Sequence, residues 1–130
     1  MIYIVDDDQS VRTNLARLMR SAGFSARTFA SAEEFLASAH NIEPGCLLLD
    51  VTLPGLSGLQ LQAELNKRGV NLPVIAVSAR DDSETSGMAR RLGARCFFRK
   101  PVDDQALIDA IQWATGPEAG KDAPAGNAER

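Results

Sequence analysis

Residues 47–58, LLLDVTLPGLSG, are the part of this 130-residue chain that best indicates its fold. Three consecutive leucines precede a carboxylate, Asp50, and an unbroken aliphatic run predicts a strand buried on both faces, as in a parallel sheet. Ligands of open parallel sheets bind just outside the carboxyl ends of the strands. Asp50 therefore stands where a functional site is expected, and Pro54 and Gly58 shape the loop that follows it.

Four other short apolar or alternating runs, each followed by a segment with helical periodicity, extend this pattern along the chain. Strands are predicted at residues 2–5, 24–29, 46–49, 73–77 and 95–98, and helices at residues 9–22, 31–39, 57–67, 82–92 and 103–114. Strands that alternate with helices form a mostly parallel sheet covered on both faces. We therefore expect one α/β domain over residues 1–115. Residues 116–130 have no aliphatic side chain beyond alanine and proline, which predicts a disordered tail or interdomain linker.

Polar residues indicate where two of these helices begin, and one helix has an unusually thin apolar face. Asp8 is predicted to be an N-cap, and Ser31 and Glu34 form a capping-box pattern. The helix at residues 82–92 includes Gly87, which costs about 1 kcal/mol relative to alanine, so it should be the least stable helix. Its inward side chains are predicted to be Met88, Ala89 and Leu92.

The overall composition excludes several classes of function. A net charge of −3 and an isoelectric point of about 5.1 give no electrostatic case for direct binding to nucleic acid or to a membrane. No apolar run approaches the roughly 20 residues of a membrane helix, and no secretory signal is evident, so we expect a cytoplasmic protein. Cys46 and Cys96 begin two predicted strands with one strand between them, which places the cysteines about 9–10 Å apart. This distance is too long for a disulfide, so both are predicted to be reduced core residues. His40 is expected in an exposed loop.

Polar side chains follow four of the five predicted strands. They are Asp6 and Asp7 after the first, Asp50 after the third, Ser78 after the fourth and Lys100 after the fifth. In a parallel sheet these strand ends meet at one edge, so the side chains should converge. Crowded carboxylates repel each other, and a hard divalent cation relieves that repulsion. Oxygen ligands of this kind fit Mg²⁺.

The converging groups favour phosphoryl transfer onto a carboxylate. The predicted site has no histidine, no cysteine and no glycine-rich phosphate loop, which argues against acyl transfer and nucleotide binding. A lysine and a hydroxyl beside a cation suit the oxygens of a phosphoryl group. Each element alone is ordinary, since an acidic pair is usually a solvated cap and a Lys-Pro pair is usually a turn. Their occurrence at successive strand ends carries the hypothesis.

The same motifs resemble those of the receiver domain of bacterial two-component response regulators, over residues 1–114. They are the acids of VDDD at residues 5–8, the spacing of Asp50, Pro54 and Gly58, the pair Ser78 and Ala79, and the pair Lys100 and Pro101. The resemblance implies a flavodoxin-like (βα)5 fold with a five-stranded parallel sheet of order 2-1-3-4-5. It implies a switch that catalyses only its own phosphorylation and dephosphorylation, rather than a turnover enzyme.

The resemblance also implies a role for each site residue. Asp50 would accept a phosphoryl group from a sensor histidine kinase or a phosphotransfer protein. Asp7 would bind Mg²⁺ directly, Asp6 mainly through water, and Thr52 through its backbone carbonyl. Mn²⁺ could substitute for Mg²⁺. Lys100 would contact the phosphoryl oxygens.

Further residues of the family pattern concern switching. The hydroxyl of Ser78 would follow the phosphoryl group, and Phe97, in the position of the family's aromatic switch residue, would turn inward. Thr52 and Arg80 hold variable positions that tune dephosphorylation in the family. The peptide bond between Lys100 and Pro101 is commonly cis in the family.

The output is expected to pass through the fourth helix, the fifth strand and the fifth helix. Ala106, Ala110 and Trp113 lie at helical spacing to one side of the predicted core stripe. This flank is either a surface for phosphorylation-dependent dimerisation or effector docking, or simply a partly covered helix edge.

Two alternative functions from other classes share features with this site or fold. A haloacid-dehalogenase-type phosphatase also uses an aspartyl nucleophile, but it needs an acid where this chain has Thr52. A module of the same fold that binds partners without phosphorylation is a second alternative. The segments SAEEFL, LPGLSGLQL and FFRKPVD are similar to receivers of nitrogen-fixation-type transcriptional regulators. The chain is then either part of such a regulator or a single-domain regulator that acts by protein contact.

Overall fold

The computed structural model describes residues 1–53, 55, 57–79 and 83–116, and they form alternating strands and helices. The strands are β1 (Ile2–Val5), β2 (Ala26–Phe29), β3 (Cys46–Asp50), β4 (Val74–Ser78) and β5 (Ala94–Arg99). The helices are α1 (Gln9–Ser21), α2 (Ala32–Ala37), the 3-10 turn η1 (Ala39–Asn41), α3 (Gly58–Lys67), α4 (Ser83–Arg91) and α5 (Asp104–Thr115). The strands pair in parallel in the order β2-β1-β3-β4-β5, which confirms the predicted topology.

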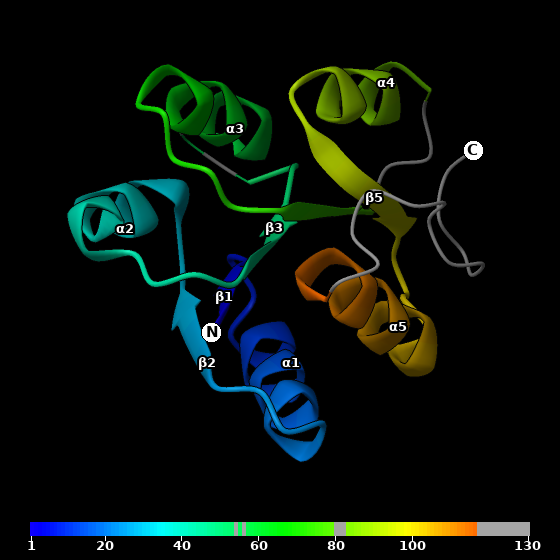
Figure 1. Cartoon of the computed structure of the whole chain (residues 1–130). Helices are drawn as coiled ribbons and strands as arrows, with labels where there is room; N and C mark the ends of the chain where they lie inside the picture. The colour runs from blue at the N-terminus through cyan, green and yellow to red at the C-terminus, as the bar shows by residue number, and fades with distance from the viewer. Residues whose placement is uncertain (54, 56, 80–82, 117–130) are drawn as a thin grey trace.

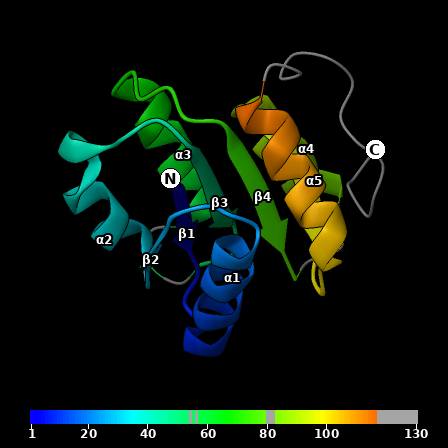
Figure 2. The same cartoon turned by 60° about the horizontal axis from the view of Figure 1, so that its bottom comes forward.

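Helices cover both faces of the sheet, as Figures 1 and 2 show. On one face lie α2, α3 and α4, and on the other lie α1 and α5. Alternate residues of β3 face opposite layers: Leu47 and Leu49 belong to the first apolar cluster and Leu48 to the second. The unbroken leucine run thus forms a strand buried on both faces, as expected for the centre of a parallel sheet.

Side-chain caps fix the starts of the helices. The Asp8 carboxylate accepts hydrogen bonds from the backbone N–H groups of Ser10 and Val11, and Ser31 accepts one from Glu34, so both predicted N-caps are confirmed. The hydrogen bond from the Ser10 hydroxyl, followed by those of the two backbone groups, holds the pKa of Asp8 below its ordinary value. A reciprocal capping box occurs at α3, between Ser57 and Gln60.

Some boundaries and one helix face differ from the predictions. The second strand begins at Ala26 rather than residue 24, and the segment predicted as the helix to residue 39 is divided into α2 and η1. On α4, Met88 is 38% exposed, so its predicted inward position was wrong. Ala89 is buried and Leu92 is partly buried, as predicted, and Ser86 is buried although it was not predicted to be.

The predicted flank on α5 also needs correction. Ala106 is 7% exposed and Ala110 is 0% exposed, and both belong to the apolar cluster formed with α1. Small residues on a helix that lies flat on the sheet are buried by the backbones around them, so these two cannot contact a partner while α5 is docked. Trp113 is partly buried at the edge of the same cluster, and its enclosed indole Nε1 has no hydrogen-bond partner among the described residues.

The cysteines are reduced core residues, as predicted. Cys46 and Cys96 are both free and buried, and β4 lies between their strands. Burial raises the pKa of the Cys46 thiol to about 12 and also raises that of Cys96. Within the described residues, none of the helices has the length and apolar character needed to span a membrane. Of the predicted tail over residues 116–130, residues 117–130 lie outside the described residues.

Candidate functional site

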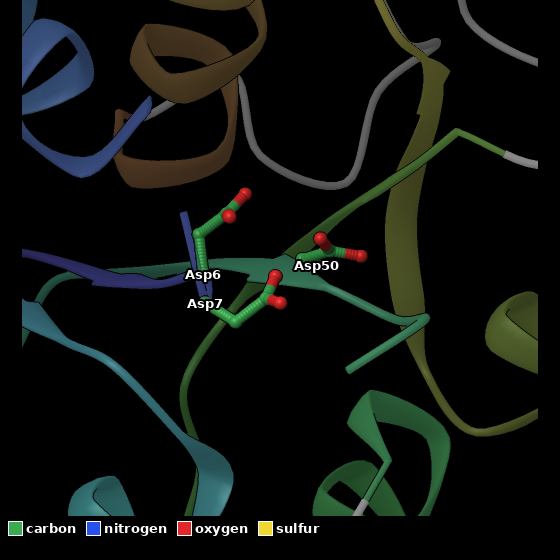
Figure 3. Close-up of side chains that lie close together, drawn as sticks. All are labelled: Asp6, Asp7 and Asp50. Carbon is green, nitrogen blue, oxygen red and sulfur yellow. The ribbon is translucent and has the colours of Figure 1, made fainter. Parts of the chain in front are cut away.

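The carboxyl ends of four strands bring the predicted polar residues to one edge of the sheet. Asp6 follows β1, Asp50 is the last residue of β3, Ser78 is the last residue of β4, and Lys100 follows β5. Figure 3 shows Asp6, Asp7 and Asp50 side by side at this edge. The convergence expected from parallel strands is therefore observed.

The three carboxylates form a group that is suited to a metal ion. Each offers one oxygen, and these oxygens lie within 4.8 Å of one another. Asp6 and Asp50 are buried, whereas Asp7 is exposed. The donors are all hard oxygen atoms, and the described residues give the Asp7 carboxylate no hydrogen bond or ion pair, so this side chain is available as a ligand. The donor set therefore fits Mg²⁺ or a similar cation.

Lys100 joins two of the carboxylates. Its Nζ lies 2.8 Å from Oδ2 of Asp6 and 3.1 Å from Oδ2 of Asp50. Burial is the largest single influence on the lysine and disfavours its charged form, but the hydrogen bonds and charges of the two carboxylates together outweigh it. The pKa of Lys100 is consequently raised.

The backbone around Lys100 fixes the position of its side chain. The N–H of Lys100 donates to the carbonyl oxygen of Ser78 at 2.8 Å, which ties the ends of β4 and β5 together. The peptide bond between Lys100 and Pro101 is cis, as predicted. Ser78 itself is completely buried at this edge.

Thr52 holds the Asp50 carboxylate in one orientation. Oδ1 of Asp50 accepts hydrogen bonds from both the backbone N–H and the Oγ1 hydroxyl of Thr52, each at 2.9 Å. Oδ2 is left facing Lys100. The predicted roles of Thr52 were a metal ligand through its carbonyl and a position that tunes dephosphorylation, and the contact from its hydroxyl to Asp50 was missed. A Thr two residues after an Asp is a local pattern that could have indicated it.

Gly58 is needed for the close approach of α3 to the end of β3. A Cβ at this position would lie 2.4 Å from the Cα of Val51 and 2.5 Å from the carbonyl oxygen of Asp50. Any larger residue would therefore push the strand end that carries Asp50. Pro54 and Arg80, also part of the predicted site pattern, lie outside the described residues.

Phe97 already faces the protein interior. It is buried in the apolar cluster that includes Ala89 of α4. Phe97 was predicted to turn inward on phosphorylation, and in this structure its side chain already lies inward.

Comparison with known proteins agrees with this geometry. The family model described as "Response regulator receiver domain" matches residues 2–112. The chain belongs to the receiver domain family of response regulators. Receiver domains of this family are not classical enzymes, and they generally bind Mg²⁺ at an acidic pocket.

The curated relatives include longer regulatory proteins. The chain is 39% identical over 118 residues to the transcriptional regulatory protein FixJ of Azorhizobium caulinodans, covering 91% of this chain and 56% of that protein. It is 41% identical over 115 residues to nodulation protein W of Bradyrhizobium diazoefficiens, covering 88% of this chain and 51% of that protein. The chain thus spans about half the length of the curated relatives it matches.

Solved structures show the same fold. The response regulator StyR superposes with a TM-score of 0.83 at 39% identity, covering 92% of this chain and 61% of the StyR chain. The structure of FixJ-N superposes with a TM-score of 0.83 at 35% identity, covering 88% of this chain and 91% of that one.

Proposed function

We propose that this domain is a phosphorylation-controlled switch in which Asp50 accepts a phosphoryl group from a phosphohistidine on a sensor kinase or phosphotransfer protein, in the cytoplasm. The observation that carries the proposal is the pairing of a buried, oriented carboxylate with a lysine at 3.1 Å and two further carboxylates within metal-binding distance of it. A structural ion pair alone would not need the exposed third acid, Asp7.

Each residue has a distinct part in the transfer. An oxygen of Asp50 attacks the phosphorus, forming a P–O bond while the P–N bond to the donor imidazole breaks, and the imidazole nitrogen keeps the electron pair. Thr52 fixes the plane of the attacking carboxylate, and Lys100 stabilises the charge on the phosphoryl oxygens. Mg²⁺ would be held directly by Asp7, Asp50 and the Thr52 carbonyl. Asp6 would contact it mainly through water. When bound, Mg²⁺ neutralises the charge that otherwise repels the donor.

The output surface is proposed to include α4, β5 and the exposed part of α5. A phosphoryl group adds roughly two negative charges and new acceptor oxygens next to Ser78, at the end of β4. Of the three α5 residues predicted for this surface, only Trp113 is accessible for contact. If Trp113→Ala left phosphorylation-dependent self-association in sedimentation experiments unchanged, its place in the dimer surface would be refuted.

Intact mass spectrometry after incubation with acetyl phosphate and Mg²⁺ tests the proposed phosphorylation. The wild type should gain the mass of one phosphoryl group, and Asp50→Asn should gain none. Asp8→Asn is a matched control, because Asp8 caps α1 in the same acidic segment, and it should still be phosphorylated. An unmodified wild type would contradict the proposal. Turnover of small phosphate esters would favour the haloacid-dehalogenase-type alternative.

For the full-length protein we propose control of transcription, because relatives such as FixJ and TdiR are named transcriptional regulatory proteins. On this proposal, residues 1–115 form the receiver, and residues 116–130 lead to an output domain. A single-domain regulator that acts by protein contact is the alternative. The coding sequence that follows the codon for Arg130 distinguishes the two.

A further inference from the structure

An arginine of α1 holds the peptide bond between the two acids that follow β1. Nη1 of Arg12 donates a hydrogen bond to the backbone carbonyl oxygen of Asp6 at 2.8 Å, and the arginine side chain is partly buried. That carbonyl belongs to the peptide plane that joins Asp6 to Asp7. The guanidinium therefore restrains the plane from which the Asp7 side chain projects.

The remaining bonds in this segment hold Asp6 and leave the Asp7 side chain unheld. The N–H of Asp6 donates to Phe29, its Oδ1 accepts the N–H of Asp8 at 2.9 Å, and its Oδ2 pairs with Lys100 at 2.8 Å. The Asp7 carboxylate is exposed and receives no hydrogen bond from the described residues. Its direction depends on the backbone on either side, which Arg12 restrains before it and the Asp8 cap restrains after it.

We propose that Arg12 is a positioning residue for the metal site, acting on Asp7 through the carbonyl oxygen of Asp6. The inference rests on the proposed function of this site as a cation-dependent phosphoacceptor. Rotation of the restrained peptide plane would swing the Asp7 carboxylate away from Asp50. Groups that orient metal ligands in this way typically change metal affinity 10- to 100-fold when they are removed.

Charge and positioning predict opposite results, so the sign of the effect decides between them. The guanidinium is a cation near a cation site. If its charge dominated, removal of Arg12 would strengthen the binding of a divalent ion, because like charges repel. If positioning dominates, removal weakens binding.

Titration with Mn²⁺, followed by the electron paramagnetic resonance of the free ion, measures this effect without phosphorylation. For Arg12→Met we expect a dissociation constant about tenfold higher than that of the wild type. Arg20→Met is the matched control, since Nη2 of Arg20 also donates from α1 to a backbone carbonyl, that of Ala26, at the opposite edge of the sheet. It should bind Mn²⁺ within about twofold of the wild type. Arg12→Lys keeps the charge, and a partial hydrogen bond should place it between the wild type and Arg12→Met.

Phosphorylation by acetyl phosphate gives a second readout. In Arg12→Met the Mg²⁺ concentration needed for half-maximal rate should rise, while the rate at saturating Mg²⁺ stays within about twofold of the wild type. Unchanged or tighter Mn²⁺ binding by Arg12→Met would overturn the inference. Equal weakening in Arg20→Met would also overturn it, because the effect would then come from α1 as a whole. If Arg12→Met does not fold, Arg12→Lys against Arg20→Lys supports the same comparison.

The two proposals fail in different ways. A wild type that binds Mn²⁺ with dependence on Arg12 but takes no phosphoryl group would refute the proposed function and keep the role of Arg12. A wild type that is phosphorylated on Asp50 but whose Mn²⁺ affinity is independent of Arg12 would refute only the role of Arg12. A wild type that binds no Mn²⁺ would refute both.

Discussion

The two helices that flank β5 are attached to the molecule in different ways. On one face of the strand, α5 is held by apolar burial. Its buried residues are Ala106, Leu107, Ala110, Ile111 and Ala114. On the other face, α4 buries only Ser86 and Ala89 of its described residues, and it exposes Met88 to solvent.

Polar bonds from α3 replace apolar burial at α4. Nε2 of Gln62 donates to the carbonyl oxygen of Ala89 at 3.1 Å, and Nδ2 of Asn66 donates to that of Leu92 at 2.9 Å. These carbonyls lie at the C-terminal end of α4, where helical carbonyls lack partners within the helix. Both bonds hold the C-terminal end of the helix.

This difference indicates which helix a signal at the site can move. Apolar burial over the length of α5 resists displacement in every direction, since each buried side chain would be exposed to water. Two hydrogen bonds at one end of α4 oppose loss of that end but offer less resistance to a pivot around it. We therefore expect α4, rather than α5, to respond to phosphorylation.

The largest expected effect comes from a substitution that creates a cavity beneath α5. Leu107 is completely buried against α1 and the sheet, so Leu107→Ala should lower the free energy of unfolding by about 2–5 kcal/mol. Urea denaturation measures it. Met88→Ala removes an exposed apolar side chain from α4 and should change the same quantity by less than about 0.5 kcal/mol. Comparable losses in the two variants would remove the contrast between the helices.

The second effect concerns Lys100, whose ion pairs with Asp6 and Asp50 attach the segment before α5 to the sheet edge. The pKa of Lys100 is raised in the folded protein, so its stabilisation is present below its unfolded pKa of 10.5 and is lost as pH rises through the folded pKa. Above pH 10.5, the free energy of unfolding of the wild type should therefore fall more steeply than that of Lys100→Met.

Controls separate this loss from other alkaline titrations. The buried thiol of Cys46, whose pKa is about 12, titrates in both proteins, so only the difference between them reports on Lys100. Lys67→Met changes an exposed lysine at the end of α3 and should keep the full alkaline loss. Parallel pH profiles of the wild type and Lys100→Met, followed by chemical denaturation, would show that the ion pairs do not stabilise this edge.

The sequence allowed the sheet and the central site residues to be predicted, because both depend on local patterns. An aliphatic run that ends in Asp50 predicts a buried strand and its end, and parallel topology brings the ends together. The positions of Ser78 and Lys100 after two other predicted strands placed them at the same edge.

The errors concern side chains whose surroundings depend on how the helices pack. Whether Ala110 is covered depends on how closely α5 approaches the sheet, and whether Met88 is covered depends on the rotation of α4. Arg12 and Gln62 gave no signal, since a polar residue on a helix normally faces solvent and its partner is a backbone carbonyl, which every residue has. Contacts of this kind are specified by the three-dimensional arrangement and not by spacing.

Replacement of Gln62 is expected to change global stability little but local stability specifically. This side chain is 1% exposed, and its Oε1 is buried without a partner in the described residues. Gln62→Met keeps the size and removes both the hydrogen bond to Ala89 and the unsatisfied oxygen. The two consequences oppose each other, so the free energy of unfolding should change by less than about 1 kcal/mol.

Local stability at α4 should nevertheless fall. Loss of a hydrogen bond worth about 1 kcal/mol corresponds to a roughly fivefold increase in the opening of the segment it holds. Hydrogen exchange of the α4 amides in Gln62→Met should therefore accelerate about fivefold, while exchange in α5 stays at the wild-type rate. Gln105→Met, which removes an exposed amide that bonds to Asp109 within α5, is the matched control and should change neither helix. If α4 exchange were unchanged in Gln62→Met, apolar contacts with β5 and not the amides of α3 would hold α4, and its pivot would have to lie elsewhere.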